Sequence, residues 1–183
     1  MVNYPNGIKK HTNVATKVYE NRGMNFESEL NDANTYYRDL DIAIIYKKPT
    51  PIKVVTMDNM HKCISKAYFE MPSTTDYNGI YKGYYIDFEA KETINKTSFP
   101  LSNIHEHQIT HLINVKRHGG LAFIIVNFKN LGEVYILDID DFKHLDRHSI
   151  PLSLFKEKGK LVPQEYVCTV NYLKAVDELY KLK

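Results

Sequence analysis

A short strand-like run places two carboxylates and a lysine on one side of the backbone. The run is "YYIDFEAK" at residues 84–91, and strand side chains alternate with a period of two, so Asp87, Glu89 and Lys91 share a face. Asp76 precedes the run in the segment "STTD". Carboxylate oxygens from adjacent strands suit a hard cation such as Mg²⁺, with places left for water and a phosphate oxygen. A neighbouring amine can orient the attacking water or neutralise the phosphate, so this set indicates metal-assisted phosphodiester hydrolysis.

A solvated strand face is the alternative interpretation of these charges, because charged side chains usually remain exposed. Two features favour a catalytic site over a solvated strand face. The turn-rich segment after Asp76 brings that carboxylate close in sequence to the strand, and Lys91 lies two residues beyond Glu89, hence on its face. Asp87 lies on the same face. We expect it either to contact the residues that bind the metal, without binding the metal itself, or to be simply exposed to solvent.

Hydrophobic spacing predicts the elements that precede the acidic strand. Asn25 offers an N-cap for a helix with one apolar face, and two β-rich runs follow at 42–48 and 52–57. Residues 58–72 form no clean element and are expected to project from the sheet. Two turn signals then lead into the acidic strand, Asn78-Gly79 and Lys82-Gly83.

A second helix is predicted after Pro100, with Ser102 as its N-cap and Gly119-Gly120 at its end. Gln108 lies on its otherwise apolar row, and an amide in that position needs a polar partner. Two more strands and a last amphipathic helix are predicted at 121–128, 133–139 and 172–180. The order helix, strands, helix, strands, helix predicts a single α/β layered domain.

Length and composition bound the class of protein. At 183 residues the chain suits one domain, and 43% hydrophobic with 25% charged residues are ordinary for a soluble globular protein. No apolar run approaches the ~18 residues of a membrane span, and the first twenty residues lack a secretion signal, so a cytoplasmic location is expected. The two cysteines, without a CxxC spacing, are expected to be reduced. A net charge of +2 means that a local basic patch must meet any anionic partner.

Several longer segments resemble one nuclease family. The spacing of Asp76 and "EAK" at 89–91 resembles the PD-(D/E)xK signature of restriction-endonuclease-like nucleases, a loose pattern by itself. The surroundings are more specific and are similar to the RecU family of bacterial Holliday-junction resolvases over about residues 1–150. The segments that carry the resemblance are "VNYPNG" (2–7), "NRGMNFESELNDAN" (21–34), "KKPTPIKVV" (47–55), "KAYFEMPSTTDYNGIYKGYYIDFEAKETINKTSFPL" (66–101) and "HEHQITHL" (105–112).

The resemblance implies a site and a cofactor. In that family the residues matching Asp76 and Glu89 hold Mg²⁺, for which Mn²⁺ is a candidate substitute, and the residue matching Lys91 stabilises the transition state. The matches of Thr74 and Gln108 complete the metal site, which would give the lone amide of the second helix its partner. The implied activity is that of an endodeoxyribonuclease that nicks four-way DNA junctions symmetrically during recombination and repair. The alternative is a non-catalytic module that binds DNA structures with the same fold.

The resemblance also implies an architecture. We expect a restriction-endonuclease-like mixed β-sheet flanked by helices, forming a nuclease domain at 23–183 behind a flexible basic N-terminal arm at 1–22. A stalk inserted into the sheet, here 56–72, would enter the junction centre, and the family builds an intertwined homodimer. A recombinase is a further candidate partner. The sequence departs from the family in a less basic stalk, a shorter arm and a divergent segment from 150 onward.

Other polar residues are weaker candidates. Glu29, on the first helix, is predicted either to join the metal site or to be solvated. Basic residues could contact DNA phosphates or simply end strands and cover edges: Arg22, Lys47, Lys48, Lys62, Lys66 and Lys96. A zinc-protease reading of "HEHQITH" fails, because the residue after His107 is Gln108 and not the glutamate that HExxH requires.

Overall fold

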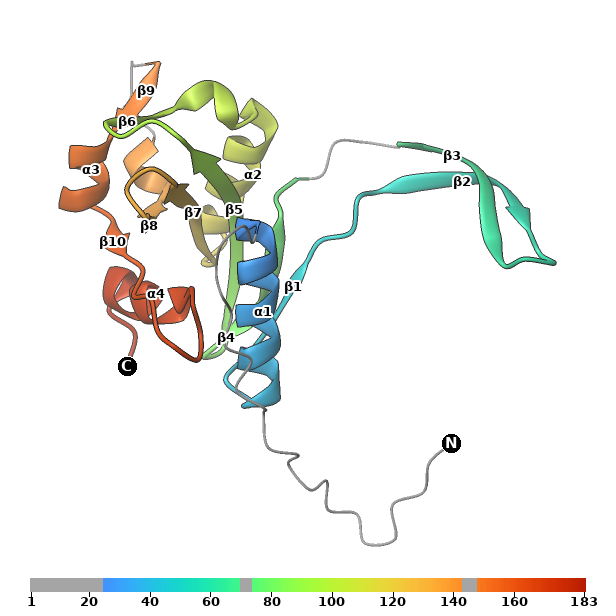
Figure 1. Cartoon of the computed structure of the whole chain (residues 1–183), viewed down its shortest axis with the longest axis horizontal. Helices are drawn as coiled ribbons and strands as arrows, with labels where there is room; N and C mark the ends of the chain where they lie inside the picture. The colour runs from blue at the N-terminus through green and yellow to red at the C-terminus, as the bar shows by residue number, and fades with distance from the viewer. Residues whose placement is uncertain (1–24, 70–73, 143–147) are drawn as a thin grey trace, which may run out of the picture.

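A six-stranded mixed sheet forms the centre of the computed structural model, which describes residues 25–69, 74–142 and 148–183 (Figure 1). The strands lie in the order β1 (Ala43–Lys47), β4 (Tyr77–Tyr81), β5 (Tyr84–Thr93), β7 (Leu121–Phe128), β8 (Glu133–Asp138) and β10 (Lys160–Leu161). Only β5 and β7 pair in parallel among these neighbours. Helix α2 (Glu106–Arg117) makes the crossover between them, as a parallel pair requires.

Helices cover both faces of this sheet. Helices α1 (Phe26–Asp39) and α4 (Tyr172–Tyr180) pack against the face that includes Ile86 and Phe88 of β5. The opposite face packs against α2 and a second apolar cluster. That cluster is completed by β6 (Ser98–Pro100), β9 (Ser149–Pro151), α3 (Leu152–Glu157) and the 3₁₀ turns η1 (Leu101–Asn103) and η2 (Ile139–Phe142). The predicted α/β fold, a mixed sheet flanked by helices, is therefore confirmed.

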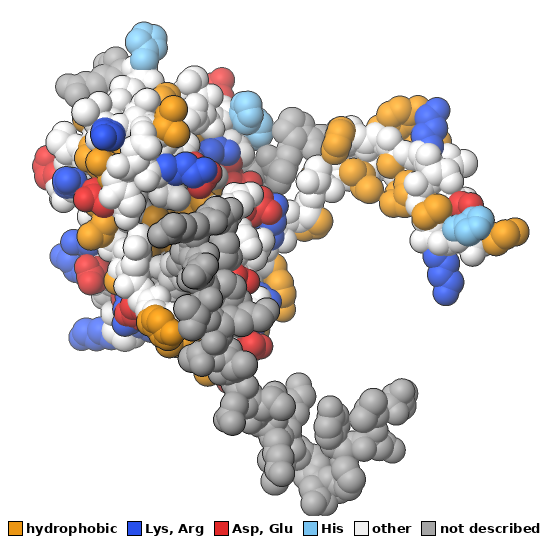
Figure 2. All heavy atoms as spheres, in the orientation of Figure 1, with side chains coloured by type: hydrophobic (Ala, Val, Ile, Leu, Met, Phe, Trp, Pro, Cys, Tyr) orange, Lys and Arg blue, Asp and Glu red, His pale blue; other side chains and the backbone are white. Residues whose placement is uncertain are grey.

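A long β-hairpin interrupts the sheet between β1 and β4. Its strands, β2 (Ile52–Asp58) and β3 (Cys63–Phe69), pair with each other and extend away from the domain (Figure 1). Apolar side chains line the hairpin in the open, and Phe69 is 82% exposed (Figure 2). The segment 58–72 was expected to form no clean element, which was wrong, because it contains the regular strand β3 paired with β2. The predicted projection begins earlier, at Ile52. Its last three residues and the N-terminal arm lie outside the described residues.

Two local predictions were wrong. Ser102 does not cap a helix, because η1 occupies that position and α2 begins at Glu106, where the Gln108 side chain accepts a hydrogen bond from the His105 amide at 3.0 Å. Asn78-Gly79 does not turn but lies within β4. A side chain at Gly79 would collide with the backbone of Ile44, so this glycine serves the close approach of β1.

The remaining boundary signals were correct. Asn25 caps α1 by accepting from the Glu27 amide at 3.3 Å, and Gly119, with a φ of 87°, follows the end of α2. Lys82-Gly83 forms the turn between β4 and β5. Among the described residues, no helix is long and apolar enough to cross a membrane.

We expect Phe88 of β5 to be the side chain on which the domain's stability depends most directly. Its ring is buried and stacked between Tyr77 and Phe123, with centroids 5.0 and 4.9 Å away. Phe88→Ala should lower the free energy of unfolding by about 3–5 kcal/mol, because it leaves a cavity at the sheet centre. Tyr84→Ala on the same strand, at a half-exposed position, should cost less than about 1 kcal/mol. Urea unfolding monitored by circular dichroism compares the two; equal losses would contradict the assignment.

Candidate active site

Asp76 and Glu89 come together next to the middle of the sheet. Glu89 points from β5 and is fully buried, and Asp76 lies at the start of β4. The carboxylate of Asp76 accepts a hydrogen bond from the Ala90 amide at 3.1 Å, which fixes it beside the residue that follows Glu89. The two negative charges are close enough that Asp76 helps to raise the pKa of Glu89.

Lys91 and Gln108 both donate to the same oxygen of Glu89. The Lys91 amine contacts Oε1 from two positions along β5, and the Gln108 amide reaches it from α2 at 2.6 Å. The polar partner expected for Gln108 is therefore the carboxylate of Glu89. Because one oxygen receives both donors, the second oxygen, Oε2, is buried without a hydrogen-bond partner among the described residues.

The electrostatics of Glu89 favour a cation. Burial, followed by the charge of Asp76, raises its pKa to about 7 against the contribution of Lys91, which lowers it. A buried oxygen without a donor, next to a second carboxylate, is a group whose charge a divalent cation would stabilise. Among the described residues, no three His, Cys, Asp or Glu side chains converge on a metal position. A cation here would therefore depend on the carboxylate pair together with neutral oxygens.

The two neutral residues expected to complete such a site, Gln108 and Thr74, differ in burial and in hydrogen-bond partners. Gln108 is buried against Glu89 and presents its NH₂ group, while its oxygen accepts from the His105 amide. Thr74 is exposed, and its hydroxyl accepts from Lys48 at 3.2 Å. Both would need to turn an oxygen towards the carboxylate pair to act as ligands.

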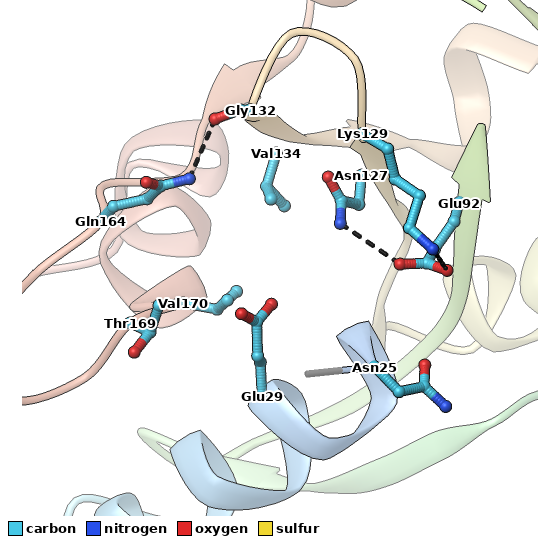
Figure 3. A pocket seen from close by; sticks show the side chains of 10 residues that line it. All are labelled: Asn25, Glu29, Glu92, Asn127, Lys129, Gly132, Val134, Gln164, Thr169 and Val170. Atoms are coloured by element: carbon cyan, nitrogen blue, oxygen red, sulfur yellow. Dashed lines mark hydrogen bonds and ion pairs between the residues drawn. The ribbon is translucent and has the colours of Figure 1, made fainter. Parts of the chain in front are cut away.

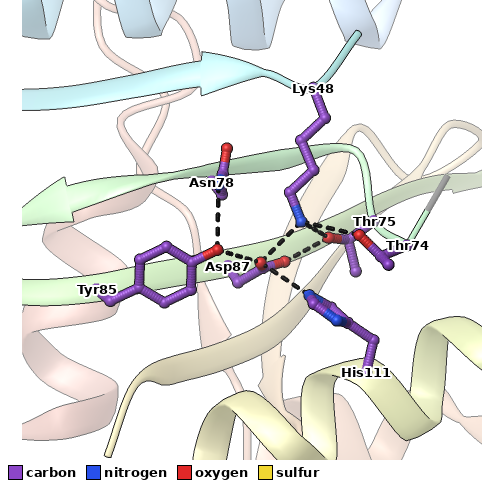
Figure 4. Close-up of polar contacts among 7 residues, drawn as sticks. All are labelled: Lys48, Thr74, Thr75, Asn78, Tyr85, Asp87 and His111. Carbon is purple, nitrogen blue, oxygen red and sulfur yellow. Dashed lines mark hydrogen bonds and ion pairs between the residues drawn. The ribbon is translucent and has the colours of Figure 1, made fainter. Parts of the chain in front are cut away.

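Asp87, the other acidic residue of β5, is fully buried and not solvated (Figure 4). It accepts hydrogen bonds from Lys48 and the Tyr85 hydroxyl, both at 2.8 Å, and from the Thr75 hydroxyl. His111 Nε2 of α2 lies 3.0 Å away. The interpretation of Asp87 as merely exposed is thus excluded, and its charge, unlike that of Glu89, is fully paired.

This cluster contains residues that the sequence analysis did not assign, namely Thr75, Tyr85 and His111. His111 could have been found, because it follows Gln108 by three positions and so shares its helix face. Lys48, expected as a phosphate contact, has its amine committed to this cluster and its side chain is only 15% exposed. A phosphate contact by Lys48 would require breaking these bonds.

Glu29 lines a cavity of about 700 Å³ (Figure 3). It points into this space from α1, opposite Glu92, and burial followed by the charges of Glu92 and Asp32 raises its pKa. Glu92 belongs to the other face of β5 from Glu89 and is held by Asn127 at 3.3 Å and Lys129 at 2.8 Å. Neither Asp76 nor Glu89 lines this cavity, but Asn25 and Glu92 border both it and the space that Asp76 lines, so a role of Glu29 in the metal site stays a prediction.

A smaller cavity of about 220 Å³ gives access to the site. Asp76 and Lys91 line it, together with Lys47 and Glu27, which form an ion pair with each other at 2.5 Å. Lys47 is thus the basic residue that borders the same space as the site. The other expected DNA contacts are scattered: Lys62 and Lys66 lie on the hairpin, Lys96 is exposed after β5, and Arg22 lies outside the described residues.

Comparisons with known proteins identify a family. The family model described as Recombination protein U matches residues 21–178. Holliday junction resolvase RecU of Staphylococcus aureus strain JH9 is 44% identical over 199 residues, covering 97% of this chain and 96% of the relative. The protein of the same name from Pediococcus pentosaceus is 45% identical over 194 residues, with the same coverage. Among solved structures, Archaeoglobus fulgidus Hjc, described as a Holliday junction resolvase, has a TM-score of 0.45 and 9% identity, covering 72% of this chain and 92% of its own.

The raised pKa of Glu89 predicts a pH-dependent stability when divalent cations are absent. Its carboxyl keeps its proton up to about 7 in the folded chain, against an ordinary value of 4.5. Between these values the folded state binds more protons than the unfolded state, so the free energy of unfolding should fall as pH rises through that window. Urea unfolding in EDTA at pH 4, 5, 6, 7 and 8 measures this. Glu89→Gln should remove this contribution and the exposed Glu106→Gln should retain it; identical profiles for the two variants would be inconsistent with the assignment.

Proposed function

The chain belongs to the RecU family of Holliday junction resolvases, and from that premise we propose that it is an endodeoxyribonuclease whose active site is formed by Asp76, Glu89 and Lys91. The observation that carries the proposal is the environment of Glu89. One of its oxygens is buried and has no donor among the described residues, and it lies beside a second carboxylate and an amine. A divalent cation bound beside these oxygens would stabilise the ionised form of Glu89, which burial and the charge of Asp76 disfavour.

Each residue of the site has a chemical role in the proposed hydrolysis. A bound Mg²⁺, or Mn²⁺ in its place, would supply Lewis-acid activation of water and of the scissile phosphate. Asp76 and Glu89 would hold it, with Thr74 and Gln108 as the further oxygen ligands. Lys91 stands next to Glu89, where its amine can neutralise the charge that grows on the phosphate during attack. Attack of water at phosphorus would leave a 5′-phosphate and a 3′-hydroxyl end.

The positions of these side chains are held by the backbone and by α2. The Ala90 amide restrains Asp76, and Gln108 restrains Glu89, so neither carboxylate has to be ordered when DNA arrives. Lys47 borders the same cavity and is the candidate for a phosphate contact next to the cut. The proposed substrate, recombining DNA, favours the cytoplasm as the place of action and a recombinase as a further partner.

We expect loss of cleavage without loss of binding when the site is altered. Glu89→Gln and Lys91→Met should each lower junction cleavage by about 10²–10³-fold or more, because each removes a group that acts on the transition state. EDTA should abolish cleavage by the unaltered protein, and Mg²⁺ should restore it. The measurement is a denaturing gel of a synthetic mobile four-way junction, a linear duplex and a single strand cut in parallel, with junction affinity from a gel shift.

The control for that experiment is Asp177→Asn, which removes a partly exposed carboxylate on α4 and should cut at the unaltered rate. Symmetrical nicks confined to the junction support the proposal. Equal digestion of plain duplex would indicate a general nuclease. Junction binding with no cleavage in Mg²⁺ or Mn²⁺ would instead establish the non-catalytic binding module.

The proposed activity also calls for a second copy of the chain. Two cuts in strands of like polarity need two sites, and a two-fold dimer would supply them in matching positions. The α2 side of the sheet is uncovered over β1 and β4, where Ile44, Ile80 and Tyr85 are direct cross-strand neighbours with exposed side chains. The hairpin strands also expose apolar side chains (Figure 2). We propose that the apolar face over β1 and β4 packs against the same face of a second protomer.

A charge on this face should therefore break the dimer. Ile44→Asp places a carboxylate in the proposed interface, and the protein should sediment as a monomer at concentrations where the unaltered chain is a dimer. Leu161→Asp is the matched control, since Leu161 is 54% exposed and Ile44 is 55% exposed but Leu161 lies on β10 at the other edge of the sheet. Analytical ultracentrifugation reads the mass. A dimeric Ile44→Asp protein would count against this face.

A further inference from the structure

Both ends of the projecting hairpin join the domain at one point. Lys48 follows β1 just before β2, and Thr74 and Thr75 lie between β3 and β4. The Lys48 amine donates to both threonine hydroxyls, at 3.2 and 2.5 Å, and its backbone amide donates to the Asp76 carbonyl at 2.7 Å. The two ends are therefore bonded directly to each other. We call Lys48 with Thr74 and Thr75 the hairpin root.

Asp87 is the acceptor on which the hairpin root rests (Figure 4). It lies on β5 with no exposed surface and accepts from both ends, from Lys48 at 2.8 Å and from the Thr75 hydroxyl. Tyr85 and His111 contact the same carboxylate from β5 and α2, at 2.8 and 3.0 Å. A buried carboxylate is stable only while such partners stay in place, so its burial holds these five groups together.

The hairpin root is continuous with the proposed cleavage site. Thr75 immediately precedes Asp76, and Asp87 lies two residues before Glu89 on the same face of β5. The Asp76 carbonyl is bonded to the root, while its carboxylate is bonded to the Ala90 amide. Any displacement of the Lys48 backbone at the hairpin root must therefore move Asp76 or break these bonds.

We propose that Asp87 is a positioning residue that fixes the hairpin relative to the Asp76–Glu89 pair, so that DNA engaged by the hairpin presents one particular phosphodiester for cutting. The inference rests on the proposed function. It gives Lys48 a role inside the protein in place of a phosphate contact. It also separates the two carboxylates of β5: Glu89 takes part in hydrolysis, and Asp87, whose charge is already paired, sets where hydrolysis occurs.

A purely structural ion pair would behave differently when removed. It would lower stability and leave the site of cutting and the turnover of the folded fraction unchanged. Asp138 provides such a pair for comparison, because it accepts from Lys116 of α2 while lying on β8, two strands from β5. Asp138→Asn is therefore the matched control for Asp87→Asn. Thr75→Val is a milder second variant that replaces a hydroxyl by a methyl group without altering the size of the side chain.

The experiment maps cuts at nucleotide resolution on an immobile four-way junction and measures kcat and junction Kd for folded protein. Asp87→Asn and Thr75→Val should lower kcat by roughly 10- to 100-fold, the range seen when outer partners of a site are removed. Junction Kd should stay within about twofold, and cuts should spread to neighbouring phosphodiesters. Asp138→Asn should cut at the unaltered positions with the unaltered kcat.

Hydrogen–deuterium exchange tests, without relying on activity, whether Asp87 stabilises the hairpin root. Exchange in peptides covering 44–52 and 74–78 should be faster in Asp87→Asn and Thr75→Val than in the unaltered protein or Asp138→Asn. The reason is that the bond from the Lys48 backbone amide to the Asp76 carbonyl is no longer supported by the contacts of the Lys48 amine with Thr75 and Asp87. Unaltered exchange, or unaltered cut positions and kcat, overturns the proposal. If Asp87→Asn does not fold, Thr75→Val decides. If the unaltered protein cuts no junction, the proposed function fails, and exchange still decides whether Asp87 anchors the hairpin.

Discussion

Burial of two carboxylates on one face of β5 is the constraint on which this structure depends. Asp87 and Glu89 lie two residues apart with no exposed surface, and each negative charge needs compensation in a medium poorer in water. Asp87 receives donors at both oxygens, whereas Glu89 receives them at one. The chemical difference between two like residues thus comes from what the neighbouring elements offer them. The incompletely paired carboxylate is the one placed beside Asp76.

The topology of the sheet supplies partners for these carboxylates. Because β5 and β7 are parallel, their connection must cross over one face, and α2 makes that crossing directly above the acidic residues. Gln108 and His111, on one side of α2, reach Glu89 and Asp87 respectively. On the other side of the sheet, Phe88 packs between Tyr77 and Phe123. Alternation along one strand therefore separates a polar site from an apolar core.

The ends of the hairpin contact one of these two carboxylates, that of Asp87. The hairpin strands expose apolar side chains, and Lys48 and Thr75, near the two ends of the hairpin, meet each other and Asp87 at the root. An element that would engage DNA and a site that would cut it share bonds across a few residues. Under the proposed function, a fixed distance between the two parts would favour recognition of a branched shape over a base sequence.

Local patterns in the sequence determined much of this protein. Period-two alternation placed Asp87, Glu89 and Lys91 on one face, an apolar helical row left Gln108 in need of a partner, and the caps at Asn25 and Gly119 were readable because they act within a few residues. Tertiary structure alone decided what each polar group touches. The sequence left open whether Asp87 is exposed or buried. The contacts that compensate its burial come from Lys48 and His111, which are 39 and 24 residues away in the sequence. The Asn78-Gly79 pair became strand because β1 needed space against a glycine, a long-range demand that outweighs local turn preference. Spacing along a chain predicts which face a side chain takes, but partners across the fold determine its charge, burial and role.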